Sequence, residues 1–412
     1  IMDADIVISL THFKGHELTG FGGAIKNIGM GCGSRAGKMA MHSIGKPSID
    51  AEKCRGCKTC THYCAQSAIS IGEDHKARID HDLCAGCGRC IGVSTSGGTK
   101  PAPDESNDIL NCKIVDNTDI RMGAIRVDAG AEALFDNCVV ADNATKSTTT
   151  YNCGGLWADG AKLLRINNCT FSNNKASGVA PCIYVFGDTG GKTNVLISNT
   201  TISGNSVNPE HATLNGGGIY VRENGNLVIV NSTVYGNHSG KGGGIAVYGT
   251  AAKPSKAVIV SCTIAGNTTV TAGNGAGLQQ AAVGGAIEVY NTLISGNTTD
   301  GAADDVAWFK DASYKVANSI IGGTVYNADG MAVAGAAFDP ASMLSPLGDN
   351  GGATKTCVLL GDANPARQYG MSASELKILG ETLDPAFGEA VSAIDQTGAS
   401  RTGKTVIGAV VK

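Results

Sequence analysis

A seven-residue unit recurs along the C-terminal three quarters of the chain, and its period constrains the fold more than any other feature. Most copies begin and end with Asn. Successive copies start 26, 31, 31, 32, 30, 30 and 27 residues apart, and the last interval leads to a shorter copy at Asn318. One coil of a parallel β-helix has this length, so the period predicts a stack of such coils. The full copies are Asn111–Asn117, Asn137–Asn143, Asn168–Asn174, Asn199–Asn205, Asn231–Asn237, Ser261–Asn267 and Asn291–Asn297.

Two positions within the unit accept only certain side chains. Alternate residues of a strand face the same side, so we expect the second and fourth positions to point into the core and to stack from coil to coil. The second position is always small: Cys112, Cys138, Cys169, Thr200, Ser232, Cys262, Thr292 and Ser319. The fourth position is always apolar: Ile114, Val140, Phe171, Ile202, Val234, Ile264, Ile294 and Ile321.

The Asn at the seventh position follows Gly or Asp in most copies, which predicts that it lies in a turn. Stacked on successive coils, these side chains can hydrogen-bond one another as a ladder, so the recurrent Asn-x-Ser/Thr tripeptides need no glycosylation to explain them. Further strands are expected at Gly216–Val221, Gly242–Val247 and Gly284–Val289. We therefore expect a right-handed parallel β-helix over residues 104–340.

The N-terminal quarter carries two cysteine clusters of a different kind. The first has the full C-x2-C-x2-C-x3-C spacing of bacterial ferredoxins, and the second has the first three members of that run. A zinc site usually divides its ligands into two separated pairs, and a disulfide framework seldom has such crowded spacing, so both are disfavoured. The candidate iron–sulfur ligands are Cys54, Cys57, Cys60, Cys64, Cys84, Cys87 and Cys90.

The second run ends one ligand short. In two-cluster ferredoxins the fourth cysteine of each run binds the other cluster, so Cys64 would complete the set formed by Cys84, Cys87 and Cys90. The set from the first run would need a thiolate at position 94, where the chain has Ser94. The sequence thus predicts one 4Fe-4S cluster, with a second that is incomplete, either 3Fe-4S or a labile 4Fe-4S.

The composition changes near Val93. Residues 1–93 hold eight of the 15 cysteines and six of the eight histidines. The net charge of −4 argues against a nucleic-acid partner, and no run of about 18 apolar residues predicts a transmembrane segment. The chain begins at Ile1 and enters a strand-like run without a signal peptide, so we expect its true N-terminus to be missing.

The phrase THFKGHELTGFGGAIKN, at residues 11–27, followed by the paired cysteine runs, resembles the iron–sulfur family called domain of unknown function 362. The resemblance covers residues 1 to about 93. It implies that residues 1–50 are a fragment of the family's main domain and that residues 51–93 are a small α+β, ferredoxin-like 4Fe-4S segment. It also implies electron transfer with a redox partner, and a cytoplasmic location.

The C-terminal phrases LGDNGGATKTCVLLGDANPA and AIDQTGASRTGKTVIGAVV resemble the end of bacterial β-helix surface proteins of the choice-of-anchor type, which are similar to polymorphic outer-membrane repeats. The resemblance covers the chain from about residue 100 to residue 412 and implies a cell-surface or secreted location. We expect residues 341–412 to form an anchor-type segment that caps the open end of the coil stack.

The two resemblances meet at residues 93/94, so we interpret this point as a junction of a chimeric chain, with a flexible linker over residues 94–103.

The first functional hypothesis is electron transfer by the N-terminal segment fused to a non-catalytic surface rod. The second is a cell-surface adhesin or structural β-helix protein that binds surface glycans or host matrix ligands, with the N-terminal part joined to it by an artefact of fusion. The third is a polysaccharide-active enzyme. Asp304 and Asp305 form an acidic pair, but no partner His or Arg motif lies near them in the sequence. Whether the chain is an enzyme therefore stays open, and the absence of enzymatic activity is the favoured expectation.

Overall fold

The computed structural model describes two compact units, Ile1–Ser106 and Asn107–Lys412. The residues described are 14–16, 20–22, 48–49, 51–62, 64, 66–81, 83–84, 90, 99–100, 107–119, 123–146, 152–178, 180, 182–187, 191–207, 215–383 and 394–411.

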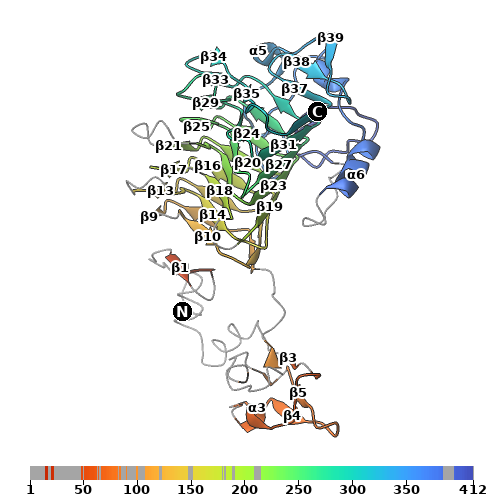
Figure 1. Cartoon of the computed structure of the whole chain (residues 1–412). Coiled ribbons are helices and arrows are strands. Elements are labelled where there is room, and N and C mark those ends of the chain that lie inside the picture. Colours follow the sequence, from red (N-terminus) through yellow and green to blue (C-terminus); the bar gives the residue numbers. More distant parts are fainter. Residues whose placement is uncertain are drawn as a thin grey trace, which may run out of the picture. The chain divides into compact units, whose positions relative to one another are not determined.

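In the C-terminal unit, each complete coil contributes one strand to each of four stacked sheets, and the strands of successive coils pair in parallel (Figure 1). The longest strands form the first sheet: β7 (Asn107–Leu110), β11 (Glu132–Asp136), β15 (Leu163–Asn167), β19 (Thr193–Ser198), β23 (Gly225–Val230), β27 (Ser255–Val260), β31 (Gly285–Tyr290) and β36 (Tyr314–Ala317). The coil period therefore arises from a β-helix, as the sequence predicts.

The recurring unit forms the second sheet and the corners on either side of it. The strands of this sheet are β8 (Lys113–Val115), β12 (Val139–Ala141), β16 (Thr170–Ser172), β20 (Thr201–Ser203), β24 (Thr233–Tyr235), β28 (Thr263–Ala265), β32 (Leu293–Ile294) and β37 (Ser319–Ile321). Two antiparallel strands, β38 (Thr324–Tyr326) and β39 (Ala332–Ala337), extend it beyond the last coil.

The third and fourth sheets complete each coil. The third consists of β9 (Thr118–Asp119), β13 (Ala144–Thr145), β17 (Lys175–Ala176), β21 (Ser206–Val207), β25 (His238–Ser239), β29 (Thr268–Thr269), β33 (Thr298–Thr299) and β34 (Ala302–Ala303). The fourth consists of β10 (Ile125–Val127), β14 (Leu156–Asp159), β18 (Ile183–Phe186), β22 (Ile219–Arg222), β26 (Ile245–Tyr248), β30 (Leu278–Gln280) and β35 (Val306–Ala307).

The apolar fourth position lies inside the coils, as predicted. Its side chains are 0–3 % exposed from Ile114 to Ile294, and only the last, Ile321, is partly exposed. Strands form at all three predicted glycine-rich segments, but the segment at Gly284 leads into the first sheet, whereas the similar segments at Gly216 and Gly242 lead into the fourth. Its counterpart in the fourth sheet is β30, so the Gly-Gly-x-Ile pattern does not identify one sheet.

The second position is restricted by hydrogen bonding as well as by size. In every copy its Sγ or Oγ donates to the carbonyl two residues earlier; Thr200, for example, donates to Ser198 at 2.7 Å. In six of the eight copies the same atom also accepts a backbone N–H of the preceding coil, as when the Cys138 N–H donates to Cys169 Sγ at 3.3 Å. Because Ala could do neither, only Cys, Ser and Thr occur here.

Both corners of the unit require left-handed backbone. The first position has φ between 45° and 54° in all copies, and the sixth has φ between 55° and 77°. Gly, Asn and Asp adopt this conformation most readily, which explains Asn at the first position and Asp, Asn or Gly at the sixth. The sixth residue thus supplies the left-handed conformation of this corner, and the seventh-position Asn follows it in the turn between the second and third sheets, as the sequence pattern predicts.

The seventh-position Asn residues form the predicted ladder. Each Nδ2 donates to the Oδ1 of the next coil's Asn at 2.8–2.9 Å, and each backbone N–H donates to the same oxygen. From Asn143 onward these side chains are at most 1 % exposed. Because every amide is buried and bonded, the Asn-x-Ser/Thr tripeptides at ladder positions have a structural explanation. The ladder members are Asn117, Asn143, Asn174, Asn205, Asn237, Asn267 and Asn297.

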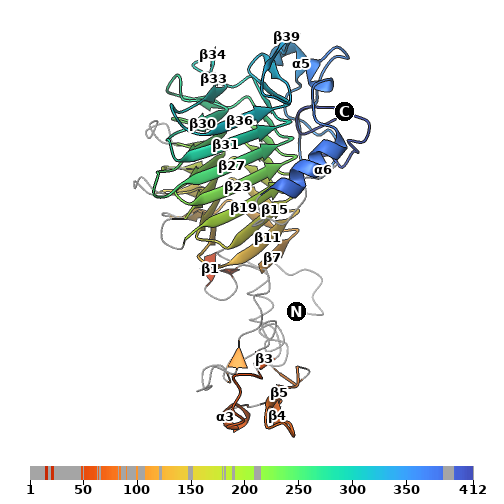
Figure 2. The same ribbon diagram turned by 45° about the vertical axis from the view of Figure 1, so that its right-hand side comes forward.

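The C-terminal segment packs along the flank of the coil stack. Its helix α6 (Ala373–Thr382) begins with a capping box of Ser372 and Glu375, and it lies against the outer face of the first sheet, where Leu376 joins Val228, Val258 and other apolar residues (Figure 2). The shorter elements are α5 (Pro340–Met343) and a 3-10 turn at Pro365–Arg367. The segment that is expected to cap the stack therefore makes extensive lateral contacts.

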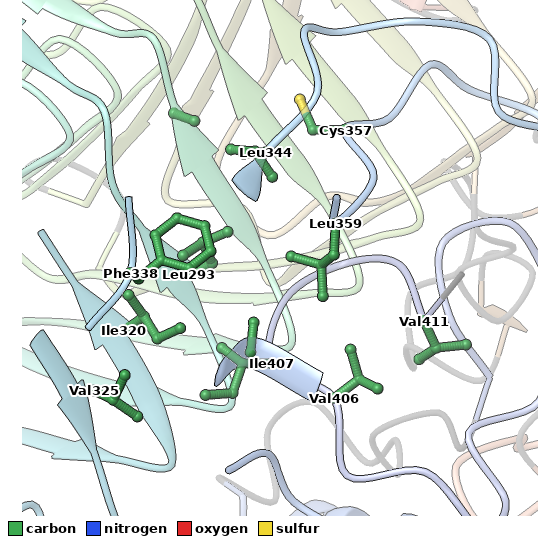
Figure 3. Packing of buried hydrophobic residues seen from close by; sticks show 12 residues of the cluster. Leu293, Ile320, Val325, Phe338, Leu344, Cys357, Leu359, Val406, Ile407 and Val411 are labelled. Atoms are coloured by element: carbon green, nitrogen blue, oxygen red, sulfur yellow. The ribbon is translucent and has the colours of Figure 1, made fainter. Parts of the chain in front are cut away.

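A second apolar cluster joins the C-terminal segment to the last coils. Phe338, Leu359 and Ile407 pack against Leu293 and Ile320, which project outward from the second sheet (Figure 3). Outward-facing apolar residues would be unusual on an exposed strand, and here the C-terminal segment covers them.

Candidate iron–sulfur site

The N-terminal unit has a short antiparallel hairpin beneath its cysteines. Strands β4 (Ile69–Ile71) and β5 (Ala77–Ile79) pair from Ile69↔Ile79 to Ile71↔Ala77, and the one-turn helix α3 (Thr59–His62) precedes them. Two further pairs are β1 (Lys14–His16) with β2 (Gly20–Gly22) and β3 (Ser48–Ile49) with β6 (Thr99–Lys100).

Strand β6 lies within the segment that is expected to be a flexible linker. Thr99 and Lys100 fall within residues 94–103, yet they are hydrogen-bonded to β3 in the N-terminal unit. The compact units divide at Ser106/Asn107. These two residues are therefore part of the first unit, while residues 94–98 and 101–103 lie outside the described part of the chain.

Cysteines from both runs share one apolar cluster. Cys54, Cys60 and Cys90 are 9 %, 8 % and 7 % exposed and pack together with Ile69 and Ala77. Partly buried residues complete the cluster: Ile49, Cys64, Ile71 and Ile79. The hairpin thus provides an apolar floor on which thiols of the first and second runs converge.

Hydrogen bonds orient two of the first-run sulfurs. The backbone N–H of Ala77 donates to Cys54 Sγ at 3.4 Å, and Thr59 Oγ1 donates to Cys57 Sγ at the same distance. The ammonium of Lys76 donates to the Cys54 carbonyl at 2.6 Å, which fixes the backbone of the loop against β5. The hydroxyl donor of Thr59 favours the thiolate form of Cys57.

Gly56 is required where the loop meets the hairpin turn. Its φ is 67°, and a Cβ atom at this position would lie 2.2 Å from the carbonyl oxygen of His75. No side chain fits there, so glycine lets the loop approach the hairpin closely.

The first-run thiols differ in their acidity. Hydrogen bonding from Thr59 lowers the pKa of Cys57, whereas burial raises the pKa of Cys60. Negative charge on Cys54 and Cys57 also contributes to raising the pKa of Cys60, so these three sulfurs are close enough to repel one another as thiolates. A bound cation would relieve that repulsion.

Six of the seven predicted ligands lie in the described part of the chain. Cys84 is partly buried and Cys57 exposed, in addition to the four cysteines of the apolar cluster. Cys87 and Ser94 lie outside the described residues. Among those described, no three His, Cys, Asp or Glu side chains are arranged to hold a single metal ion. The sequence pattern did not identify Thr59, Lys76 and Ala77 as residues that hold the cysteine loop.

The cysteines at the second position and the acidic pair Asp304–Asp305 have structural roles in the coils. Cys138 and Cys169 make the coil-to-coil bonds of the second position, and burial raises the pKa of Cys262 to about 12. Asp305 accepts from Asn297, and Asp304 accepts from the Thr299 hydroxyl and from the backbone N–H groups of residues 273–275. The acidic pair is thus committed to hydrogen bonds within the fold.

Comparison with known proteins finds different family models for the two parts of the chain. Residues 1–150 match the family model of a domain of unknown function (DUF362), and residues 180–321 match the right-handed β-helix region model. The first match extends beyond the interpreted junction at residues 93/94 and into the coils. No helix among the described residues is long and apolar enough to cross a membrane.

Two curated relatives match a short part of the chain. Pyruvate synthase subunit PorD of Methanocaldococcus jannaschii is 39 % identical over 46 residues, which are 11 % of this chain and 54 % of that protein. The PorD subunit of Methanothermobacter marburgensis is 40 % identical over 45 residues, 11 % of this chain and 51 % of that protein. The chain thus spans about half the length of these relatives. Its N-terminal part resembles the domain of unknown function 362 family, and its C-terminal part is a right-handed parallel β-helix.

Proposed function

We propose that the N-terminal unit binds an iron–sulfur cluster and transfers electrons, and that the β-helix is a non-catalytic rod. The observation that carries this proposal is the convergence of Cys54, Cys60, Cys64 and Cys90 on one apolar cluster. Cysteines from separate runs gather there above a hairpin, in surroundings that exclude water.

The donor set fits an iron–sulfur cluster. Thiolates are the ligands that such clusters take, and each thiolate of a four-iron cluster binds a different iron, so its sulfurs need not converge on a single point. Apolar surroundings and N–H···S bonds, such as that of Ala77 to Cys54, are among the features that set cluster potentials.

We assign the complete site to the thiolates of Cys64, Cys84, Cys87 and Cys90. The second set, Cys54, Cys57 and Cys60, lacks a thiolate at position 94, so it would hold a 3Fe-4S or a labile 4Fe-4S cluster. When bound, such a group accepts and releases single electrons. The residues of this chain hold it, shield it with the hairpin isoleucines, and leave one edge accessible to a redox partner.

The similarity to PorD supports this assignment. That protein is named as a subunit of pyruvate synthase, so its matching segment serves within a larger enzyme. By analogy, the N-terminal unit would exchange electrons with a partner protein and would not carry out substrate chemistry itself.

The proposal of a non-catalytic rod rests on the β-helix interior. The described cysteines at the second position and both members of the Asp304–Asp305 pair are engaged in hydrogen bonds that hold the coils together. These bonds leave none of them poised for acid–base or nucleophilic work.

The test is anaerobic reconstitution of the full chain with iron and sulfide, followed by visible absorption and reduction with dithionite. We expect a broad charge-transfer band that bleaches on reduction. Cys64→Ala and Cys90→Ala should each lose most of the band, whereas the matched control Cys262→Ser, in the β-helix core, should retain it. A band that survives both N-terminal substitutions would refute the ligand assignment.

A further inference from the structure

One cysteine of the candidate iron–sulfur site differs from the others in its exposure. Of the ferredoxin-type cysteines that the structure describes, Cys57 is exposed, whereas Cys54, Cys60 and Cys90 are buried and Cys64 and Cys84 are partly buried. A ligand at the surface is the point at which a partner can come nearest to the cluster. The loop that carries Cys57 is therefore the part of the candidate site that a partner protein can approach most closely.

This loop is positively charged although the chain as a whole is not. Residues 52–58 carry three cations, Lys53, Arg55 and Lys58, and one anion, Glu52, and all four side chains are exposed. The chain's formal net charge is −4. The basic residues alternate around Cys54 and Cys57, so their charge lies directly beside the candidate ligands.

The loop is held in a defined conformation. Gly56 fits against the His75 carbonyl, and Lys58 has a φ of 62°. The Lys58 carbonyl accepts from Thr61 Oγ1 at 2.7 Å and from the His62 N–H at 3.2 Å. On the neighbouring hairpin turn, Asp74 is paired with Arg78 at 3.1 Å, so this exposed carboxylate is partly neutralised by its own pair.

We propose that this basic edge, defined as Lys53, Arg55, Cys57 and Lys58, is where the electron-transfer partner docks, and that the partner presents an acidic surface. The inference rests on the proposed iron–sulfur function. Charges beside the contact point raise the encounter rate with a partner of opposite sign, and salt screens the effect over about 10 Å at 0.1 M ionic strength.

The test uses charged oxidants in place of the unidentified partner. The full chain is reconstituted, its iron and sulfide are counted, and the reduced protein is mixed with hexacyanoferrate(III), an anion, or with hexaammineruthenium(III), a cation. We expect the anion's rate to fall about tenfold as salt is raised from low to physiological strength, and the cation's rate to rise. The variant Lys53→Glu/Arg55→Glu/Lys58→Glu should reverse both dependences.

A matched control separates local from overall charge. Lys192→Glu/Lys310→Glu/Lys377→Glu changes the net charge equally, and these three lysines are exposed in the β-helix unit. This control should behave as the unmodified chain. If it reversed the salt dependence as strongly as the loop variant, or if neither variant did, the docking edge would be wrong although the cluster had formed.

A second readout needs no cluster. In the metal-free chain, a dianionic aromatic disulfide should modify Cys57 about tenfold faster than its neutral analogue at low salt, with the site identified by mass spectrometry. Equal rates, or faster modification of Cys54 or Cys60, would overturn the proposed edge. Absence of iron from the reconstituted chain, with charge-selective modification of Cys57 intact, would instead count against the iron–sulfur function.

Discussion

The backbone N–H and the side-chain Nδ2 of Asn297 both donate to one carboxylate oxygen of Asp305, each at 2.8 Å. This contact ends the Asn ladder. Each Asn from Asn143 to Asn267 accepts from the Asn of the preceding coil and donates to the Asn of the following coil, so the final Asn needs a further acceptor. The aspartate side chain has no N–H group, so it accepts the last two hydrogen bonds and adds no side-chain donor that would need a partner.

Replacing the terminal carboxylate should change how stability depends on pH. Burial raises the pKa of Asp305, so the folded state binds this proton more tightly than the unfolded state, in which the pKa is about 3.9. The free energy of unfolding should therefore fall as pH rises through the raised pKa. In Asp305→Asn this decline should disappear. Urea unfolding from about pH 4 to neutral checks this, and an unchanged pH profile would contradict it.

A substitution in the middle of the ladder should be costly. Asn205 is fully buried, accepts from Asn174, and donates to Asn237 and to the Phe171 carbonyl. Asn205→Ala leaves several buried groups unpaired, so we expect a loss of about 3 kcal/mol in the free energy of unfolding. Asn117→Ala, at the partly exposed start of the ladder, is the control and should cost less than half as much. Equal losses would show that burial in the interior of the ladder does not increase the contribution of an Asn to the free energy of unfolding.

The second position of the unit should tolerate serine better than alanine. Cys169 accepts from the Cys138 N–H and donates to the Asn167 carbonyl. Cys169→Ser keeps both bonds, as Ser232 and Ser319 do in other coils, and should cost little. Cys169→Ala removes both and should destabilise by about 1–2 kcal/mol. Thermal unfolding compares the two variants, and a more stable alanine variant would show that size alone governs this position.

The docking of the C-terminal segment should depend on Gln396. Its side chain accepts from Thr233 at 2.6 Å and donates to Thr201 at 3.0 Å and to Thr354 at 2.9 Å. Gln396→Ala leaves these buried hydroxyls with fewer partners, so the segment should detach more often. Tryptic cleavage after Arg401, which is 1 % exposed, should accelerate about tenfold. The exposed control Ser400→Ala should not change this rate, and unchanged cleavage in Gln396→Ala would argue for another anchor.

The periodic features of the fold could be predicted from the sequence because each recurs once per coil. The inward fourth position follows from strand alternation, and the Asn ladder follows from the coil period, which brings equivalent residues of successive coils together. The sheet to which the Gly284 segment belongs could not be predicted, because its local pattern is shared by strands of two sheets. No local pattern contains the contact of Leu376 with Val228 or of Gln396 with Thr201, because these pairs lie more than a hundred residues apart.

The sequence contains less information about the geometry of the candidate iron–sulfur site. Spacing identifies the cysteines, but which of them is buried depends on the β4–β5 hairpin, and the bond from Lys76 to Cys54 spans 22 residues without a sequence signature. The pairing of Thr99 with Ile49 could not be predicted from the local composition either, because the Ser-, Thr- and Gly-rich sequence around Thr99 indicates only a linker.

Restoring the absent ligand provides a further prediction. Ser94→Cys supplies the fourth thiolate that the set from the first run lacks. A soft thiolate ligand binds the iron of such clusters better than the serine hydroxyl does. We expect iron content to rise toward about eight per chain, the content of two four-iron clusters. Ser96→Cys, two residues along the same segment, is the matched control and should leave the iron content unchanged.

Counting iron and acid-labile sulfide in the anaerobically reconstituted full chain shows whether the N-terminal unit holds iron–sulfur clusters. We expect about four firmly bound irons with a similar number of sulfides, together with a further, easily lost fraction. A chain that retains no iron would contradict the proposed cluster binding, and two equally stable four-iron clusters without any change at Ser94 would contradict the proposed ligands.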